Sequence, residues 1–205
     1  MLSIEDITYE EYLEIVSENE ESLETMLQDA EEQKEDSVQS LGAMNENYDP
    51  HMGDILTTDS TSSYGVTGHN GIVVGEGHVL HFPGPGENPE IISWEDWIDT
   101  YPSTIVHRPT DTVGSQEAAI WATNHYGGQE VDYGFNLNLY ELSESYCSKL
   151  VWQAFANTSI GAEEPGIIPG YGIIVPYDVA DAVNSDHVVP YDSMSDEQEN
   201  QEEAA

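Results

Sequence analysis

The segment that decides the fold is SESYCSKLVWQAF, residues 143–155, which contains the only cysteine of the chain. Apolar residues recur at helical spacing after this cysteine, and Ser143 or Ser145 is a suitable N-cap, so we expect a helix whose first turn carries Cys147. Unpaired N–H groups and the helix dipole at that position favour a thiolate over a thiol. Cys147 is therefore a candidate nucleophile with a lowered pKa. The alternative is a small buried cysteine that packs beside Leu150.

The length of 205 residues fits one domain with a hydrophobic core and flanking segments. A single cysteine excludes an internal disulfide, a cysteine-rich zinc site and an iron–sulfur cluster. No apolar run approaches the length of a membrane span, and the first residues lack the basic and apolar pattern of a secretory signal. We therefore expect a soluble protein without a membrane-spanning helix.

The chain carries three basic residues against 41 acidic residues, which gives a formal net charge of -38. Such a chain repels phosphate backbones and anionic lipid surfaces, so binding to nucleic acid is not expected. The acidic residues are spread over the whole length. Adaptation to high salt and a surface made negative for another purpose are both compatible with this distribution. Either explanation concerns solubility and not the chemistry of a site.

The two ends of the chain differ in composition from its middle. Thr8 and Glu11 form a capping-box pattern, and a narrow apolar stripe among many glutamates follows them. We predict a helical arm over residues 1–45, which is either a solvated packing helix or an arm that resembles a propeptide. The main domain is expected over residues 46–192 and a disordered acidic tail over residues 193–205.

A β-hairpin is predicted over residues 69–82, where a Gly-Glu-Gly sequence joins two apolar runs. With Glu76 at the centre of a three-residue loop, Val74 pairs with His78 across the hairpin. Counting outward from this pair fixes the partner of every other residue in the two strands. A two-residue loop would shift the pairing by one residue and move every side chain to the opposite face.

The three-residue loop brings His69 and His81 to one face of the hairpin. Gly71 then pairs with His81, and His69 lies one diagonal position away, where two imidazoles can interact. His78 points to the opposite face, so we prefer His81 as the partner of His69. We interpret Gly71 as a gap beside His81, because a packing position would favour a bulky residue. The alternative is that both histidines are structural.

The rest of the domain consists of short elements separated by turns rich in Gly and Pro. The expected elements are a strand after Gly53, a capped helix at 93–98, a strand at 104–108, a helix at 115–125 closed by two glycines, a helical turn that begins at Pro176 and a last strand at 187–189.

Four segments of the chain resemble the circularly permuted NlpC-type cysteine hydrolases, the YiiX/YebB and YycO-like group. The segments are GDIL at 53–56, GHNGIV at 68–73, VLH at 79–81 and YCSKLVWQ at 146–153. In this group the histidines precede the cysteine helix, whereas the order is reversed in ordinary relatives of papain. The permuted branch also includes lecithin retinol acyltransferase. The resemblance implies a papain-like α+β fold, with the cysteine helix packed on an antiparallel sheet that carries the histidines.

The resemblance also implies the roles of the site residues. Cys147 matches the nucleophile, His69 the general base and His81 the polar residue that orients the base. The choice of His81 agrees with the hairpin register, which was argued from the residues alone. The backbone N–H of Cys147 is expected to stabilise an oxyanion, and Tyr146 and Tyr133 are candidates for substrate binding.

These residues indicate a thiol hydrolase that cleaves an amide or peptide bond through a thioester intermediate. His69 either takes the proton of the thiol or maintains an imidazolium–thiolate pair. A peptidoglycan stem peptide is the type of substrate that the resemblance suggests. Two other classes stay open, namely an acyltransferase or thioesterase that acts on lipid-like acyl esters, and a binding module that keeps the fold without activity.

No metal or other cofactor is expected, because the remaining histidines lack the spacing of metal ligands. These histidines are His51, His107, His125 and His187. A peptide or amide substrate is the expected partner, and the oligomeric state stays open. The resemblance suggests a protein that is secreted or attached to the cell envelope.

Overall fold

The structure is a computed structural model that describes residues 48–63, 66–75, 77–165, 169–183 and 188–190. The predicted helical arm at residues 1–45 and the predicted tail at residues 193–205 lie outside these described residues. All the helices and strands described below therefore lie within the range predicted for the main domain.

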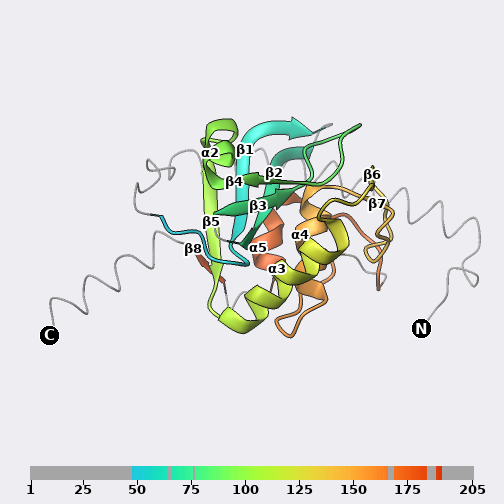
Figure 1. The fold of residues 1–205 in the computed structure, drawn as a ribbon. Helices are drawn as coiled ribbons and strands as arrows, with labels where there is room; N and C mark the ends of the chain where they lie inside the picture. Colours follow the sequence, from blue (N-terminus) through green and yellow to red (C-terminus); the bar gives the residue numbers. More distant parts are fainter. Residues whose placement is uncertain (1–47, 64–65, 76, 166–168, 184–187, 191–205) are drawn as a thin grey trace, which may run out of the picture.

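The main sheet of the described domain has six antiparallel strands in the order β4-β3-β2-β1-β5-β8 (Figure 1). The hairpin that carries the histidines, β2 and β3, lies between β1 and β4. A separate pair of short parallel strands, β6 and β7, precedes the cysteine helix in the chain. The strands are β1 (Ile55–Ser63), β2 (Val66–Gly75), β3 (His78–His81), β4 (Glu90–Ser93), β5 (Thr104–Pro109), β6 (Asp132–Tyr133), β7 (Glu144–Ser145) and β8 (Val188–Pro190).

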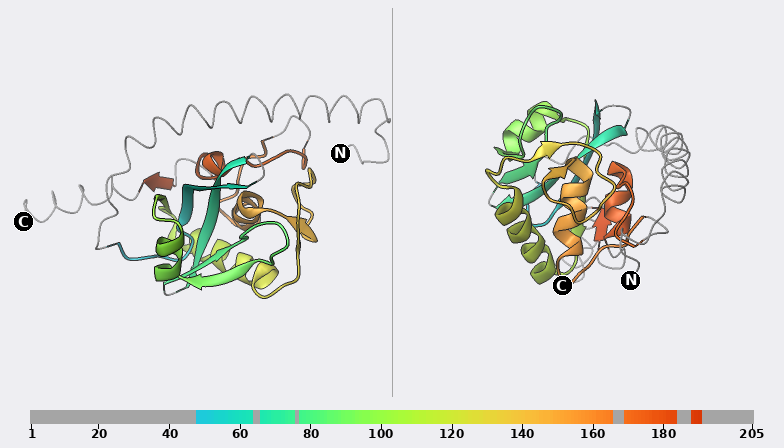
Figure 2. Two further views of the ribbon diagram at one scale, coloured as in Figure 1. Left: turned by 90° about the horizontal axis from the view of Figure 1, so that it is seen from above. Right: turned by 90° about the vertical axis from the view of Figure 1, so that its right-hand side faces the viewer.

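Helices cover both faces of this sheet. Figure 2 shows α3, α4 and α5 side by side in one layer, while α2 lies across the sheet from them. The combination of an antiparallel sheet with helices on its two faces is the predicted α+β arrangement. The helices are α2 (Trp94–Thr100), α3 (Thr112–Tyr126), α4 (Cys147–Ala156), the 3₁₀-helix η2 (Pro176–Asp178) and α5 (Val179–Ala182).

The hydrophobic core is divided into two clusters by the sheet. Because successive side chains of a strand point to opposite faces, Ile72 and Leu80 pack against α3 and α4, whereas Val73 and Val79 pack against Trp97 of α2. A strand that is buried on both faces has a continuous apolar run, which explains the lack of alternation in this hairpin.

The helix starts follow from local capping. The hydroxyl of Ser93 accepts a hydrogen bond from the N–H of Asp96 at 3.0 Å, and α2 begins directly after this cap. The next helix, α3, begins at Thr112 and thus earlier than the predicted start at residue 115. The reason is the carboxylate of Asp111, which accepts backbone N–H groups of the first turn.

The predicted serine cap of the cysteine helix is wrong. Tyr146 occupies the N-cap position of α4 and makes no side-chain hydrogen bond to the helix. Ser145 lies in β7, where it pairs with Tyr133, and its hydroxyl accepts a hydrogen bond from Tyr126 at 3.2 Å. Pairing in a strand therefore holds this serine away from the cap, and Ser143 lies even further from the helix start.

The predicted register of the histidine hairpin is confirmed at the end that carries His81. Gly71 pairs with His81 in the β2–β3 ladder, as expected. At the loop, His78 pairs with Gly75 and not with Val74, because the ladder is irregular and skips Val74. The irregularity lies between the loop and the histidine pair, so it leaves the face of His81 unchanged.

A buried ion pair fixes the segment that leads into the sheet. The side chain of Asp54 is fully buried, and its two oxygens accept hydrogen bonds from Nε and Nη2 of Arg108 at 2.8 and 2.7 Å. Nη2 also donates to the backbone oxygen of Asp49 at 2.7 Å. This bidentate arrangement satisfies a charge that would be costly to bury alone, and it ties the start of β1 to β5.

Candidate active site

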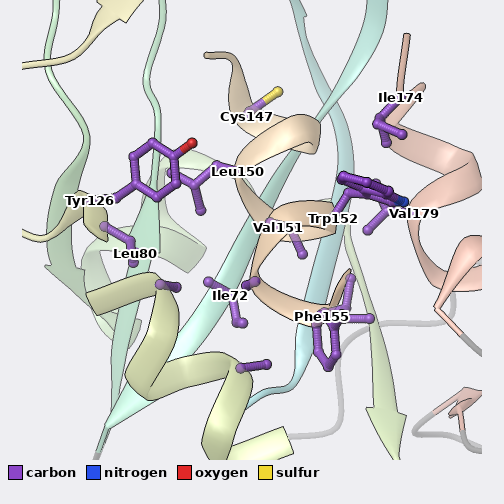
Figure 3. Packing of buried hydrophobic residues seen from close by; sticks show 14 of the residues in the cluster. Ile72, Leu80, Tyr126, Cys147, Leu150, Val151, Trp152, Phe155, Ile174 and Val179 are labelled. Carbon is purple, nitrogen blue, oxygen red and sulfur yellow. The ribbon is translucent and has the colours of Figure 1, made fainter. Parts of the chain in front are cut away.

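Cys147 is the first residue of α4, as predicted, and it is 3% exposed. Figure 3 shows Cys147 at one end of the helix, with Leu150 and Phe155 further along it. The cysteine is also part of the apolar cluster that α4 buries against the sheet. The two interpretations of the sequence therefore describe the same residue, which starts a helix and is buried at the margin of the core.

His69 of β2 and His81 of β3 form a buried pair in which His69 Nε2 lies 2.9 Å from His81 Nδ1. The two rings meet edge to face, with centroids 5.2 Å apart. His78 is exposed, so the predicted separation of the two β3 histidines is confirmed. This hydrogen bond uses one nitrogen of each ring, and the nitrogens outside it are His69 Nδ1 and His81 Nε2.

The histidine pair lies on the α2 face of the sheet. The ring of His69 stacks on Trp97 at 5.6 Å between centroids and lies 5.0 Å from the ring of Tyr101. The ring of His81 meets the edges of the same two aromatic rings. The apolar core of α4 lies on the other face of the sheet, where it packs against Ile72 and Leu80.

Cys147 and the histidine pair approach each other where the β2–β3 ladder ends. The N–H of Val73 donates toward the β1 side, so the N–H of Asn70, an odd number of residues away, points toward β3. The ladder ends at the Gly71 pair, and the N–H of Asn70 extends beyond it. This N–H faces the sulfur of Cys147. Cys147 thus contacts the backbone of β2 at Asn70, the residue after His69.

Gly71 makes room for an aromatic ring. A Cβ atom at this position would lie 2.9 Å from ring atoms of Trp97 and 2.7 Å from a methyl group of Val79. The predicted gap beside His81 is therefore wrong, because the indole of Trp97 fills that space. The glycine allows the indole to cover both histidines, and Trp97 is itself held by a hydrogen bond from Nε1 to Thr104 at 3.0 Å.

Burial sets the protonation of the site. Desolvation lowers the pKa of His69 to about 3 and that of His81 to about 4, and the neighbouring His81 contributes further to the shift of His69. Burial raises the pKa of the Cys147 thiol, although backbone N–H groups of Asn70 and Ser148 act in the opposite direction. The predicted low pKa of the thiol is therefore wrong. Burial therefore favours the neutral forms of the thiol and of both imidazoles.

Two further residues of the site were not predicted from the sequence. Tyr101 caps the end of α2, and burial raises its pKa, as do the charges of Cys147 and Glu90. Its position four residues after Trp97 on one helix face was the available signal. Glu90 is the strand partner of His81 in β4, and Glu90 Oε1 lies 3.3 Å from His81 Nε2. The Pro- and Gly-rich loop before β4 concealed this pairing.

The two tyrosines predicted for substrate binding lie near the start of α4. The hydroxyl of Tyr146 accepts a hydrogen bond from the N–H of Ile174 at 2.9 Å and is buried, so it holds the chain that follows α4. The ring of Tyr133 is half-buried and lies between Phe82 and Phe135. Of the two tyrosines, Tyr133 is thus the one whose side chain is accessible.

Buried polar side chains of α4 hold the loop that leads to the cysteine. Gln153 donates through Nε2 to the backbone oxygens of Leu139 and Glu141 at 2.6 and 3.1 Å. Lys149 donates to the backbone oxygen of Glu144 at 3.1 Å, and burial lowers the pKa of this lysine to about 8. Both residues belong to the segment that we used to predict the helix, yet their contacts depend on the loop and not on helical spacing.

The described residues contain no group of three or more His, Cys, Asp or Glu side chains arranged to hold a metal ion. His51, His107 and His125 therefore form no such group, and His187 lies outside the described residues. Among the described helices, none is sufficiently long and apolar to span a membrane.

The arrangement of the sheet and helices is similar to that of a solved structure. The crystal structure of the metalloprotein yiiX from Escherichia coli O157:H7 superposes with a TM-score of 0.51 and 19% sequence identity, over 70% of this chain and 97% of that chain. This similarity shows the fold, and it confirms the predicted papain-like α+β architecture of the YiiX group.

Sequence relatives define the family. An uncharacterized 30.3 kDa protein of Bacillus thuringiensis is 31% identical over 138 residues, which are 60% of this chain and 51% of that protein. The chain therefore spans about half the length of this curated relative. The family model of LnsA-like lipoprotein N-acylation proteins matches residues 23–189, which include the histidine hairpin and the cysteine helix. The chain belongs to this LnsA-like lipoprotein N-acylation family.

Proposed function

We propose that the protein is an acyl-transfer enzyme in which Cys147 forms a thioester, His69 is the general base and His81 orients the base. The observation that carries the proposal is the hydrogen bond between His69 and His81. The residue after His69 in β2 is Asn70, whose backbone N–H faces the sulfur of Cys147. Two buried imidazoles in series, on the strand whose backbone contacts a buried thiol, are suited to proton transfer.

The first half of the reaction forms the acyl-enzyme. His69 Nδ1 takes the proton of the thiol as Cys147 Sγ attacks the carbonyl carbon, and the same proton then passes to the leaving group. The backbone N–H of Cys147 at the start of α4 is the proposed donor to the oxyanion. General-base assistance of this kind contributes about 10²- to 10⁴-fold in rate.

The second half of the reaction transfers the acyl group to an acceptor. His69 now removes a proton from the acceptor, which attacks the thioester carbon, and the proton returns to the sulfur. The family description, lipoprotein N-acylation, favours an amine as the acceptor and an acyl ester as the donor. The order of the chain, with the histidines before the cysteine, supports membership of the permuted branch that includes acyltransferases.

Hydrolysis of an amide or peptide bond is the second candidate function. The papain-like architecture favours it, because the same nucleophile and base can transfer the acyl group of a peptide to water. A peptidoglycan stem peptide remains the proposed substrate in that case. Both candidates suit a protein at the cell envelope, and both use Tyr133 as the proposed substrate-binding residue.

A metal has no assigned part in this proposal. The solved relative is called a metalloprotein in its title, but the described residues of this chain provide no set of three donors for an ion. One nitrogen of His69 and one of His81 are used in the bond between the two rings. These residues therefore do not fit a metal centre, and no step above involves one.

The proposal is tested by mass spectrometry of the intact protein after mixing with an acyl ester or with a stem-peptide amide. We expect an acyl adduct that hydroxylamine removes, that an added amine discharges faster than water does, and that is absent in Cys147→Ser. Faster formation from the stem peptide than from the ester would favour the hydrolase. The absence of an adduct from either substrate in a folded protein would contradict acyl transfer and favour a binding module.

A further inference from the structure

Glu90 lies at the outer end of the histidine pair. It is the cross-strand partner of His81 in the β3–β4 ladder, and this pairing brings the two side chains to the same face of the sheet. Glu90 Oε1 is 3.3 Å from His81 Nε2. The carboxylate is about half exposed, whereas His81 is 2% exposed, so the contact joins solvent to the buried pair.

His81 Nε2 needs a partner on this side. Among the described residues it is a buried nitrogen without a hydrogen bond, because Glu90 is within ion-pair distance but is not aligned for one. A buried polar atom without a partner costs free energy, and a small rotation of the exposed carboxylate would supply the missing acceptor. Among the described residues, Glu90 is thus the group placed to satisfy Nε2.

The tautomers of the two rings follow from this contact. A carboxylate only accepts hydrogen bonds, so a hydrogen bond from His81 to Glu90 requires the proton on Nε2 and leaves an unprotonated Nδ1 facing His69. His69 Nε2 must then be the donor in the 2.9 Å bond, which leaves His69 Nδ1 unprotonated. The direction of every hydrogen bond in the series is therefore set at its exposed end.

We propose that Glu90 is a positioning residue that holds His81 in the Nε2–H tautomer and thereby fixes His69 Nδ1 as the nitrogen that accepts the proton of Cys147. The last step rests on the proposed function, whereas the tautomers of the two histidines do not. No proton leaves His81 or reaches Glu90 during the reaction. The thiol proton moves to His69 Nδ1, and the carboxylate stabilises the resulting positive charge through the neutral ring of His81.

Tyr101 covers both imidazoles of this series. Its ring lies 5.8 Å from that of His81 and 5.0 Å from that of His69, and it covers both from the α2 side.

The tautomers can be measured directly by long-range proton–nitrogen NMR spectra of the full chain with isotope-labelled histidine, assigned with His69→Gln and His81→Gln. We expect the Nε2–H tautomer for both histidines in the wild type. In Glu90→Leu, His81 should become a mixture of tautomers, and Glu87→Leu, which removes an exposed carboxylate outside the ladder, should leave the spectrum unchanged. The Nδ1–H tautomer of His81 in the wild type, or an unchanged spectrum in Glu90→Leu, would overturn the proposal.

Kinetics test the consequence for the base. Glu90→Leu should lower kcat for thioester formation about tenfold with little change in KM, as expected for a partner that orients a functional imidazole. Glu90→Gln, whose amide oxygen can still accept the Nε2 proton, should recover part of this loss, and Glu87→Leu should match the wild type. A rise in KM with unchanged kcat would assign Glu90 to substrate binding and contradict its positioning role. If the wild type forms no thioester, the proposed function fails, while the NMR spectra still decide the role of Glu90.

Discussion

The two faces of the sheet bury different kinds of side chain. The face under α3 and α4 is an apolar core that ends at Cys147, whereas the face under α2 holds two imidazoles beneath Trp97 and Tyr101. The first face places Cys147 at the start of α4, and the second buries His69 and His81 and thereby lowers their pKa values. The comparison teaches that this site depends on both faces and on the end of one strand ladder between them.

The largest expected effect comes from breaking the imidazole pair on the α2 face. His81→Ala removes the acceptor of His69 Nε2–H, so the base loses its orientation, and we expect thioester formation to slow by about a hundredfold or more. The matched control is His78→Ala, which removes an exposed histidine of the same strand. Circular dichroism checks the fold of both variants. Equal rates of thioester formation in the two variants would show that His81 does not orient the base.

Acid should destabilise the α2 face. His69 has a folded pKa of about 3, so between about pH 6 and pH 4 the unfolded chain binds a proton that the folded chain does not. Stability then falls as the pH falls, by about 1.4 kcal/mol per pH unit for such a histidine. Urea unfolding at several pH values should show a smaller loss for His69→Gln than for the wild type. Equal pH dependence of the two proteins would mean that His69 is protonated in the folded state.

The fit between the hairpin and α2 is tested by adding one methyl group. Gly71→Ala places a Cβ atom against the indole of Trp97, and we expect a loss of about 1–3 kcal/mol in the free energy of unfolding. Gly75→Ala is the control, because a Cβ atom there meets nothing within 4 Å. If Gly71→Ala is as stable as Gly75→Ala, the indole does not lie against the strand.

The smallest effect is expected in the pKa of the Cys147 thiol on the α4 face. Since burial raises the pKa of Cys147, the ultraviolet absorbance of a thiolate should appear only above the ordinary pKa of about 8.5. The difference spectrum between the wild type and Cys147→Ser isolates this signal from the tyrosines. A thiolate at neutral pH would instead indicate the imidazolium–thiolate pair.

The sequence predicts the parts of the site that depend on local periodicity. The helical spacing after Cys147 located the helix start, and the predicted pairing register of the hairpin located His69 and His81 on one face. These features follow from the geometry of single elements, which neighbouring residues determine. The irregular pairing of Val74 did not affect the result, because it lies beyond the histidines.

Other features depend on packing between distant segments and could not be predicted. Glu90 is adjacent to His81 only because the chain returns from a loop to form β4, and Trp97 covers the pair only because α2 docks on the hairpin. The pKa of Cys147 was predicted with the wrong sign for the same reason. Helix position and N–H groups can be inferred from the local sequence, but the larger effect of burial depends on the whole core.

The most direct test of the account is the pH dependence of thioester formation in the wild type and in His69→Ala. If His69 takes the proton of Cys147, the wild-type rate should be nearly constant from about pH 5 to pH 8, because the base is neutral throughout that range. The His69→Ala rate should be lower by about 10²- to 10⁴-fold and should rise about tenfold per pH unit, because only ionised thiol then reacts. A wild-type rate that rises with pH as steeply as that of His69→Ala would contradict the joint action of the two faces.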